Sequence, residues 1–205
     1  MIAALYVAKD GCYYNVPDCD PWDQERDARL YDGPWSVVAH PPCARWCKLA
    51  RLAEVRYGYK VGDDGGCFGH ALRCVREFGG VLEHPAGSLA WSAFGLAQPR
   101  HGAWQLTIFG DWVTEVSQVA YGHKARKRTW LLYKGERPPP ALDWSEPAPT
   151  HQVSWQYDPK TGTYHLPPLT KAEAKATPLP FRDLLIGMAR TATTKPGEGP
   201  GRATT

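Results

Sequence analysis

Residues 35–47 read WSVVAHPPCARWC, and this stretch decides how the rest of the chain can be arranged. Residues 36–39 form a short β-branched apolar run, which is typical of a buried strand. His40 and two prolines then end the strand, because a proline nitrogen cannot donate a ladder hydrogen bond. Cys43 follows at once, and residues 44–57 predict a helix. The stretch therefore predicts an α/β sheet with a thiol between a strand and a helix N-terminus, which favours the thiolate.

The composition is that of an ordinary globular protein, since 43% of the 205 residues are hydrophobic and 22% are charged. The net charge of +3 is too small to indicate nucleic-acid binding by itself. No apolar run is long enough to span a membrane, and the opening MIAALYVAKDGC lacks the pattern of a signal peptide. We therefore expect a cytoplasmic protein whose six cysteines are not cross-linked.

Hydrophobic periodicity predicts strands and helices that alternate along the first two thirds of the chain. The clearest helix is expected at 67–78, where Asp64 can cap the first turn and two glycines follow the last one. A hairpin is expected around Asp10-Gly11. Beside the run at 36–39, strands are predicted at 3–7, 12–16, 81–82, 104–109, 112–119 and 129–133.

The composition changes at residue 138 and divides the chain into three parts. Residues 1–137 are predicted to form an α/β domain. Residues 138–190 are rich in proline and extended, and they end in a short amphipathic helix at 178–190. We expect this helix to dock on the domain or on a second copy of the chain, as in a homodimer. Residues 191–205 are small, polar and rich in glycine and proline, which predicts disorder.

Three short motifs carry side chains that can act on an electron-poor ring. Cys43 and Glu83 each follow a short apolar run, so both side chains can converge on one edge of a sheet. A thiolate can add to carbon 6 of a pyrimidine while a carboxyl group hydrogen-bonds the ring nitrogen that gains electron density. Arg126 and Arg128, which follow Tyr121-Gly122, can hold a phosphate or the carbonyl oxygen of the base.

With these motifs in this order, the chain resembles the cytosine-5 DNA methyltransferases. In that family a Pro-Cys motif carries the nucleophile, a Glu-Asn-Val motif begins with the acid, and an Arg-x-Arg motif follows a Tyr-Gly. Cys43 matches the nucleophile, Glu83 the acid, and Arg126 with Arg128 the arginine pair. The separations from Cys43, about 40 residues to the acid and about 83 to the first arginine, are close to those typical of the family. The resemblance covers roughly residues 35–133.

The resemblance implies a reduced Rossmann-like methyltransferase core with a Pro-rich C-terminal extension. It also implies transfer to carbon 5 of cytosine in DNA or in a cytosine nucleotide, with S-adenosylmethionine as the donor. Short relatives of this kind resemble phage-encoded proteins, which implies the host cytoplasm as their location. Candidate substrate contacts near the matched motifs are His40, Pro42, His84, Tyr121 and Lys124.

The chain departs from the family pattern at three places. His84-Pro85 stands where the family has Asn-Val. No Gly-rich cofactor loop is visible before Cys43, so the residues that would bind S-adenosylmethionine are not identified. No target-recognition domain is visible after Arg128.

Two other interpretations stay open at the level of sequence. His40, Cys43 and Cys47, together with the similarly spaced Cys67, His70 and Cys74, contain enough ligands for a zinc ion. However, the second cluster falls on a predicted helix, where the same spacing describes ordinary packing. The chain could also be a non-catalytic derivative of the same fold that binds nucleic acid or a protein.

Overall fold

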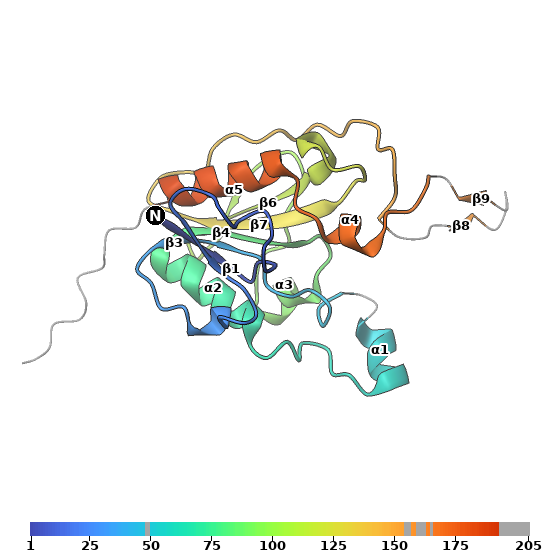
Figure 1. The fold of residues 1–205 in the computed structure, drawn as a ribbon, viewed down its shortest axis with the longest axis horizontal. Helices are drawn as coiled ribbons and strands as arrows, with labels where there is room; N and C mark the ends of the chain where they lie inside the picture. The colour runs from blue at the N-terminus through green and yellow to red at the C-terminus, as the bar shows by residue number, and fades with distance from the viewer. Residues whose placement is uncertain (48–49, 154–156, 159–162, 165, 193–205) are drawn as a thin grey trace, which may run out of the picture.

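The computed structural model describes residues 1–47, 50–153, 157–158, 163–164 and 166–192, and its centre is a seven-stranded mixed sheet (Figure 1). The order of the strands across the sheet is β2-β1-β3-β4-β7-β6-β5. The first four of these are parallel, and β7, β6 and β5 each run antiparallel to the preceding neighbour. The strands are β1 Ile2–Leu5, β2 Cys19–Trp22, β3 Ser36–Ala39, β4 Gly80–Pro85, β5 Gln105–Leu106, β6 Trp112–Ser117 and β7 Arg128–Lys134.

The parallel half of the sheet reverses its winding direction at β1. From β1 the chain moves outward to β2, and it then returns across β1 to form β3 on the other side. The carboxyl ends of these parallel strands therefore meet at one edge of the sheet. In α/β proteins, ligands bind outside such a point of reversal.

Helices cover both faces of the sheet, so the molecule has three layers (Figure 1). One face carries the helices α2 Cys67–Phe78 and α3 Leu89–Ala93. The other face carries α5 Leu179–Thr191, which contacts β1, β3 and β4. Side chains of β3 alternate between the two faces of the sheet. Val37 and Ala39 lie in the core under α2, and Val38 lies in the core under α5.

These observations confirm the predicted α/β class, and helix α2 has the predicted bounds. Asp64 accepts hydrogen bonds from the amides of Gly66 and Phe68, as expected of a residue that caps this helix. Helix α5 lies close to the predicted range of 178–190 and docks on the sheet of its own chain. Its apolar face is therefore not available to a second copy. No helix in the described part of the chain could span a membrane.

The predicted strand at 12–16 is wrong. Those residues form turns, with hydrogen bonds from the Gly11 amide to the Ala8 carbonyl and from the Tyr14 amide to the Gly11 carbonyl. The strand that follows β1 in the chain is β2, and it pairs with β1 in parallel orientation. A tight hairpin cannot join parallel strands, so the intervening residues cross over the sheet instead.

The predicted helix at 44–57 begins later than expected, because α1 spans only Ala50–Tyr57. The preceding residues form turns in which the amide of Trp46 donates to the carbonyl of Cys43. Trp46 is buried, and its indole donates to the Asp64 carboxylate over 2.7 Å. This anchor draws residues 44–47 onto the body of the protein, so Cys43 does not lie at a helix N-terminus.

The remaining elements are short. In the region predicted as strand 104–109 only β5 is regular, and the segment after β4 contains the short helix α3. The Pro-rich segment includes a small hairpin of β8 Tyr157–Asp158 and β9 Thr163–Tyr164. It also includes α4 Lys171–Lys175, whose first turn is closed by a capping box between Thr170 and Glu173. The predicted disorder of 191–205 concerns residues that lie almost entirely outside the described part.

We expect Phe181→Ala to lower the free energy of unfolding by about 3–5 kcal/mol, because its ring is fully buried between α5 and the sheet. Urea denaturation followed by circular dichroism measures this change. Leu179→Ala at the exposed start of the same helix is the control, and it should change stability by about 0.5 kcal/mol or less. Equal effects of the two variants would contradict the placement of α5.

Candidate functional site

The candidate site lies at the carboxyl ends of β3 and β4, two neighbouring parallel strands. Ala39 pairs with Leu82 across these strands, so the next residues, His40 and Glu83, lie side by side. The prolines after His40 end β3 and lead to Cys43. The local sequence therefore places an imidazole, a carboxylate and a thiol at one edge of the sheet.

Buried hydrogen bonds hold the Glu83 carboxylate in place. His40 Nδ1 lies 2.9 Å from Glu83 Oε2, and His40 Nε2 lies 2.7 Å from the hydroxyl of Tyr13. Because an ionised carboxylate can only accept, Nδ1 carries a proton here, and in a neutral imidazole Nε2 then accepts from the tyrosine. On the other side, the amide of Gln118 donates to Glu83 Oε1 over 3.3 Å and to Thr129 over 2.9 Å.

The environment keeps Glu83 ionised although it is only 9% exposed. Burial by itself raises the pKa of a carboxyl group. The hydrogen bond from His40 and the positive charge of Lys127 outweigh this effect, so the pKa of Glu83 is lowered. In the free protein at neutral pH, Glu83 is therefore a carboxylate with fixed orientation.

Cys43 lies at the mouth of a small hollow of about 80 Å³. The residue is exposed, yet the protein around its thiol removes part of its water, and this together with the charge of Glu83 raises the pKa of Cys43. The positive charge of Lys127 lowers the pKa of Cys43 by a smaller amount. The expected activation by a helix N-terminus is thus wrong, because α1 starts too late. Glu83 is near enough to act on the thiol electrostatically but does not line the hollow, whose walls are Cys43, Trp46, Cys47 and residues 84–88.

His84 is completely buried behind this hollow, between the rings of Phe68 and Trp91. Neither ring nitrogen has a hydrogen bond of good geometry within the described residues, although the carbonyls of Pro41 and Pro42 lie nearby. Burial lowers the pKa of His84 to about 4, so the imidazole is neutral. His84 therefore shapes the wall of the hollow and carries no charge there.

The burial of His84 makes stability depend on pH. In the unfolded chain its pKa is near the ordinary 6.5, and in the folded protein it is about 4, so the unfolded state binds the extra proton between these values. Stability should therefore fall by roughly 3 kcal/mol as the pH decreases through this window. In His84→Asn that part of the decrease should be absent, which urea denaturation at a series of pH values measures. Parallel pH profiles of the two proteins would contradict a neutral buried His84.

The structure does not bring Arg126 and Arg128 to the thiol in the way that the motif predicts. The guanidinium of Arg128 pairs with Glu115 of β6 over 2.7 Å, and Arg126 is exposed. The residue between them, Lys127, is the cation whose charge reaches both Glu83 and Cys43. Neighbouring side chains of an extended segment point to opposite sides. Lys127 therefore faces the site, and Arg126 and Arg128, one residue to either side, do not.

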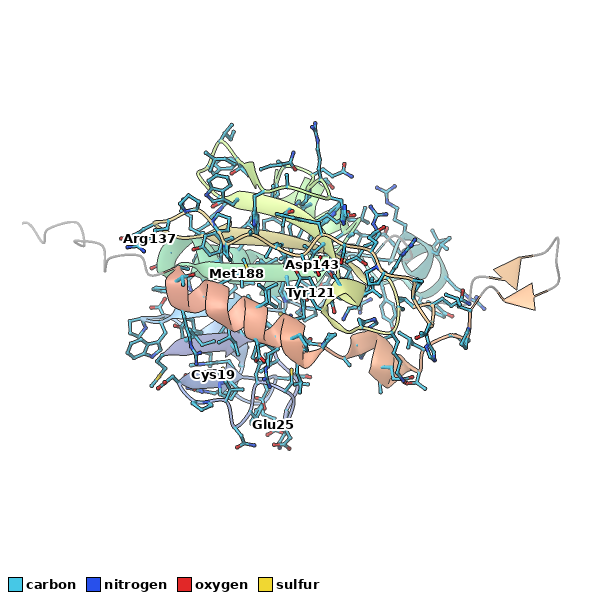
Figure 2. The ribbon with its side chains drawn as sticks, turned by 90° about the horizontal axis from the view of Figure 1, so that it is seen from above. Cys19, Glu25, Tyr121, Arg137, Asp143 and Met188 are labelled. Carbon is cyan, nitrogen blue, oxygen red and sulfur yellow. The ribbon has the colours of Figure 1, made fainter. Side chains whose placement is uncertain are left out.

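Two predicted substrate contacts also lie elsewhere. The hydroxyl of Tyr121 accepts a hydrogen bond from the amide of Asp143 while its ring packs on Phe181, so it belongs to the α5 face (Figure 2). The ammonium of Lys124 forms an ion pair of 2.6 Å with Glu173 of α4. Of the predicted residues, His40, Pro42, Cys43, Glu83 and His84 are those that the structure gathers at one sheet edge.

Residues that the sequence analysis missed complete the site: Tyr13, Gln118 and Lys127. Tyr13 is buried and comes from the turn after β1, and Gln118 follows β6. No local pattern marks them, because their roles depend on contacts between distant segments. For Lys127, alternation next to the arginine pair was an available signal.

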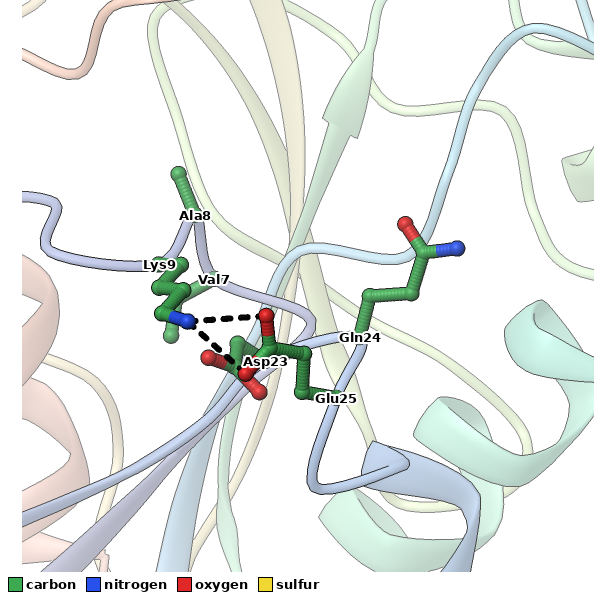
Figure 3. A pocket seen from close by; sticks show the side chains of 6 residues that line it. All are labelled: Val7, Ala8, Lys9, Asp23, Gln24 and Glu25. Carbon is green, nitrogen blue, oxygen red and sulfur yellow. Dashed lines mark hydrogen bonds and ion pairs between the residues drawn. The ribbon is translucent and has the colours of Figure 1, made fainter.

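A second, larger hollow lies at the carboxyl ends of β1 and β2, between the segments that follow these strands (Figure 3). It measures about 500 Å³ and is lined by residues 7–9 and 23–25. Asp23 is buried and accepts hydrogen bonds from the Tyr14 hydroxyl and the Arg26 amide. The ammonium of Lys9 lies 2.8 Å from both oxygens of Glu25, an exposed pair that a ligand can displace at little cost.

In the part of the chain that the structure describes, no group of three histidine, cysteine or acidic side chains is placed so that it could hold a metal ion. All six cysteines are free. Comparison of the chain with known protein families, with curated proteins and with solved structures gives no match.

Proposed function

We propose that the protein modifies carbon 5 of a pyrimidine, cytosine in DNA or in a nucleotide, through a covalent adduct of Cys43, on a reduced Rossmann-like methyltransferase core. One observation carries the proposal. The thiol of Cys43 and the fixed carboxylate of Glu83 follow neighbouring parallel strands and share one edge, close enough for the carboxylate to raise the pKa of the thiol. A nucleophile beside an acid-base group is the pair that conjugate addition to a pyrimidine requires.

In the proposed reaction, the Cys43 thiolate forms a bond to carbon 6, and the electron pair of the 5,6 double bond moves to carbon 5. Carbon 5 then takes up the electrophile. The carbon 5 proton then passes to solvent water, its electron pair re-forms the 5,6 double bond, and the bond between carbon 6 and sulfur breaks to return the Cys43 thiolate. Throughout, Glu83 accepts a hydrogen bond from the exocyclic amino group of the ring, while His40 and Gln118 keep the orientation of the carboxylate. Lys127 offsets the negative charge of the thiolate.

The larger hollow fits the donor that the resemblance implies. S-adenosylmethionine, when bound, supplies a methyl group as the electrophile. The carboxylates of Asp23 and Glu25 follow β2 and can accept hydrogen bonds from ribose hydroxyls, and the hollow is large enough for a nucleoside. We expect S-adenosylmethionine to raise the melting temperature of the protein, and Glu25→Gln to reduce this shift, as measured by differential scanning fluorimetry. An unchanged shift in Glu25→Gln would contradict this placement.

The proposal is tested with an oligonucleotide that contains 5-fluorocytosine, in the presence of S-adenosylmethionine. Fluorine at carbon 5 prevents the last elimination, so the protein should stay covalently joined to the oligonucleotide. Intact-mass spectrometry should give the summed mass of both plus one methyl group and minus the hydrogen that the thiol loses. Peptide mapping should place the bond at Cys43. If no adduct forms with oligonucleotide or free nucleotide, the proposed reaction is wrong, and a non-catalytic binder becomes the better interpretation.

A further inference from the structure

Helix α1 and the residues after it form an arm that stands apart from the sheet and its covering helices (Figure 1). We define the arm as residues 50–60. Apart from Ala50, the residues whose burial the structure describes in this range are all exposed. Val55 is 89% exposed and Leu52 66% exposed, so the helix does not serve the core. A short helix that buries almost no side chains against the core gains little stability from tertiary packing. Its exposed side chains are therefore available to bind a partner.

The base of the arm is fixed to the wall of the Cys43 hollow. Trp46 and Cys47 line that hollow, and the amide of Ala50, the first residue of the arm, donates to the Cys47 carbonyl over 2.9 Å. At the other end, the amide of Gly62 donates to the carbonyl of Arg45 over 2.9 Å, and Gly62 packs against the Trp46 ring at a positive φ of 83°. The arm therefore leaves from and returns to the rim of the candidate site.

The charge of the arm is strongly one-sided. Arg51, Arg56 and Lys60 are basic, and Glu54 is the single acidic residue in 50–60. With Arg45, whose guanidinium stacks on the Tyr59 ring at 4.0 Å, the net charge is +3, as large as that of the whole chain. This positive charge lies beside the candidate site, where it complements a polyanion.

Two tyrosines on the arm add flat surfaces to this charge. Tyr57 is 62% exposed and Tyr59 is 50% exposed, and their ring centroids lie 6.1 Å apart. Aromatic rings between basic side chains are the combination with which proteins bind single-stranded nucleic acids, since bases stack on the rings while the cations hold phosphates.

We infer that the arm binds the DNA strand that carries the target base, so the substrate is a polynucleotide rather than a free nucleotide. The inference rests on the proposed function for the identity of the base, but strand binding by the arm does not require chemistry at Cys43. The target base, out of the stack, reaches the hollow at the base of the arm, and the flanking nucleotides lie along residues 50–60.

The test measures binding in the Cys43→Ser protein, so that turnover cannot interfere. Fluorescence anisotropy with a labelled single-stranded 20-mer gives Kd over a range of salt concentrations. The triple variant Arg51→Gln, Arg56→Gln, Lys60→Gln should weaken binding on the order of 100-fold at about 50 mM salt and lower the salt slope by about 2. Tyr57→Ala should weaken it about 10-fold, and Tyr57→Phe should not.

The matched control removes the same charge from exposed positions elsewhere: Arg137→Gln, Lys171→Gln, Lys175→Gln. It should retain most of the affinity. Equal losses in both triple variants would overturn the inference, as would a lack of binding to any oligonucleotide. Binding to vesicles of phosphatidylglycerol and phosphatidylcholine but not to DNA would make the arm a membrane contact instead. Failure of the adduct experiment with intact strand binding would reject the proposed reaction and leave the arm's role standing.

Discussion

In the Cys43→Ser protein we expect no covalent adduct with 5-fluorocytosine DNA, whereas Cys47→Ser should still form it. A serine hydroxyl has no nearby base in this site that could take its proton, since Glu83 is held by His40 and Gln118 and has a lowered pKa. The two cysteines make a close comparison. Both are exposed and line the same hollow, but Glu83 shifts the pKa of Cys43. Intact-mass spectrometry after a fixed incubation measures the adduct.

Both variants must be folded for the comparison to hold. Each replaces sulfur by oxygen at an exposed position, so the melting temperature should change by only a few degrees at most. If Cys43→Ser still forms the adduct and Cys47→Ser does not, the nucleophile is Cys47, and its assignment to Cys43 from the Pro-Cys motif is wrong. If both form it, addition does not use a cysteine of this hollow.

The parts of the fold that the sequence predicted best are those whose pattern is local. Helix α2 has a capping residue before its first turn, an apolar stripe along its twelve residues and a double glycine after its last turn. In the folded protein each of these features acts as its sequence pattern indicates. The corner after β3 was equally predictable, because two prolines end a strand in any context. The placement of His40, Cys43 and Glu83 at one edge followed from the general behaviour of parallel strands.

The errors arise where contacts between distant residues decide the conformation. The start of α1 depends on the bond from Trp46 to Asp64, eighteen positions later along the chain. The missing hairpin at 12–16 depends on Tyr13, which is buried and bonded to His40 rather than paired in a sheet. Likewise, Glu115 holds the guanidinium of Arg128, and no spacing within 126–128 reveals that partner.

Glu83→Gln should have opposite effects on two reactions of the same thiol. Addition of Cys43 to the pyrimidine should slow by about 10²- to 10⁴-fold, because the ring loses the carboxylate that accepts from its amino group and orients it toward the thiol. Alkylation of Cys43 by iodoacetamide, which needs only the thiolate, should become faster. The charge of Glu83 raises the pKa of Cys43, so its removal lowers that pKa and increases the thiolate fraction at a fixed pH near 8.

Lys127→Gln provides the matched control, because it removes a charge of the opposite sign that also acts on the Cys43 thiol. Lys127 lowers the pKa of Cys43, so this variant should be alkylated more slowly than the parent protein at every pH below full ionisation. In all three proteins the alkylation rate should rise with pH as the thiol ionises, with the curve shifted to lower pH in Glu83→Gln and to higher pH in Lys127→Gln. Stopped alkylation followed by peptide mapping at Cys43 gives these rates. A Glu83→Gln protein whose addition and alkylation both slow would indicate a disturbed loop, and one in which neither changes would place Glu83 outside the reach of the thiol.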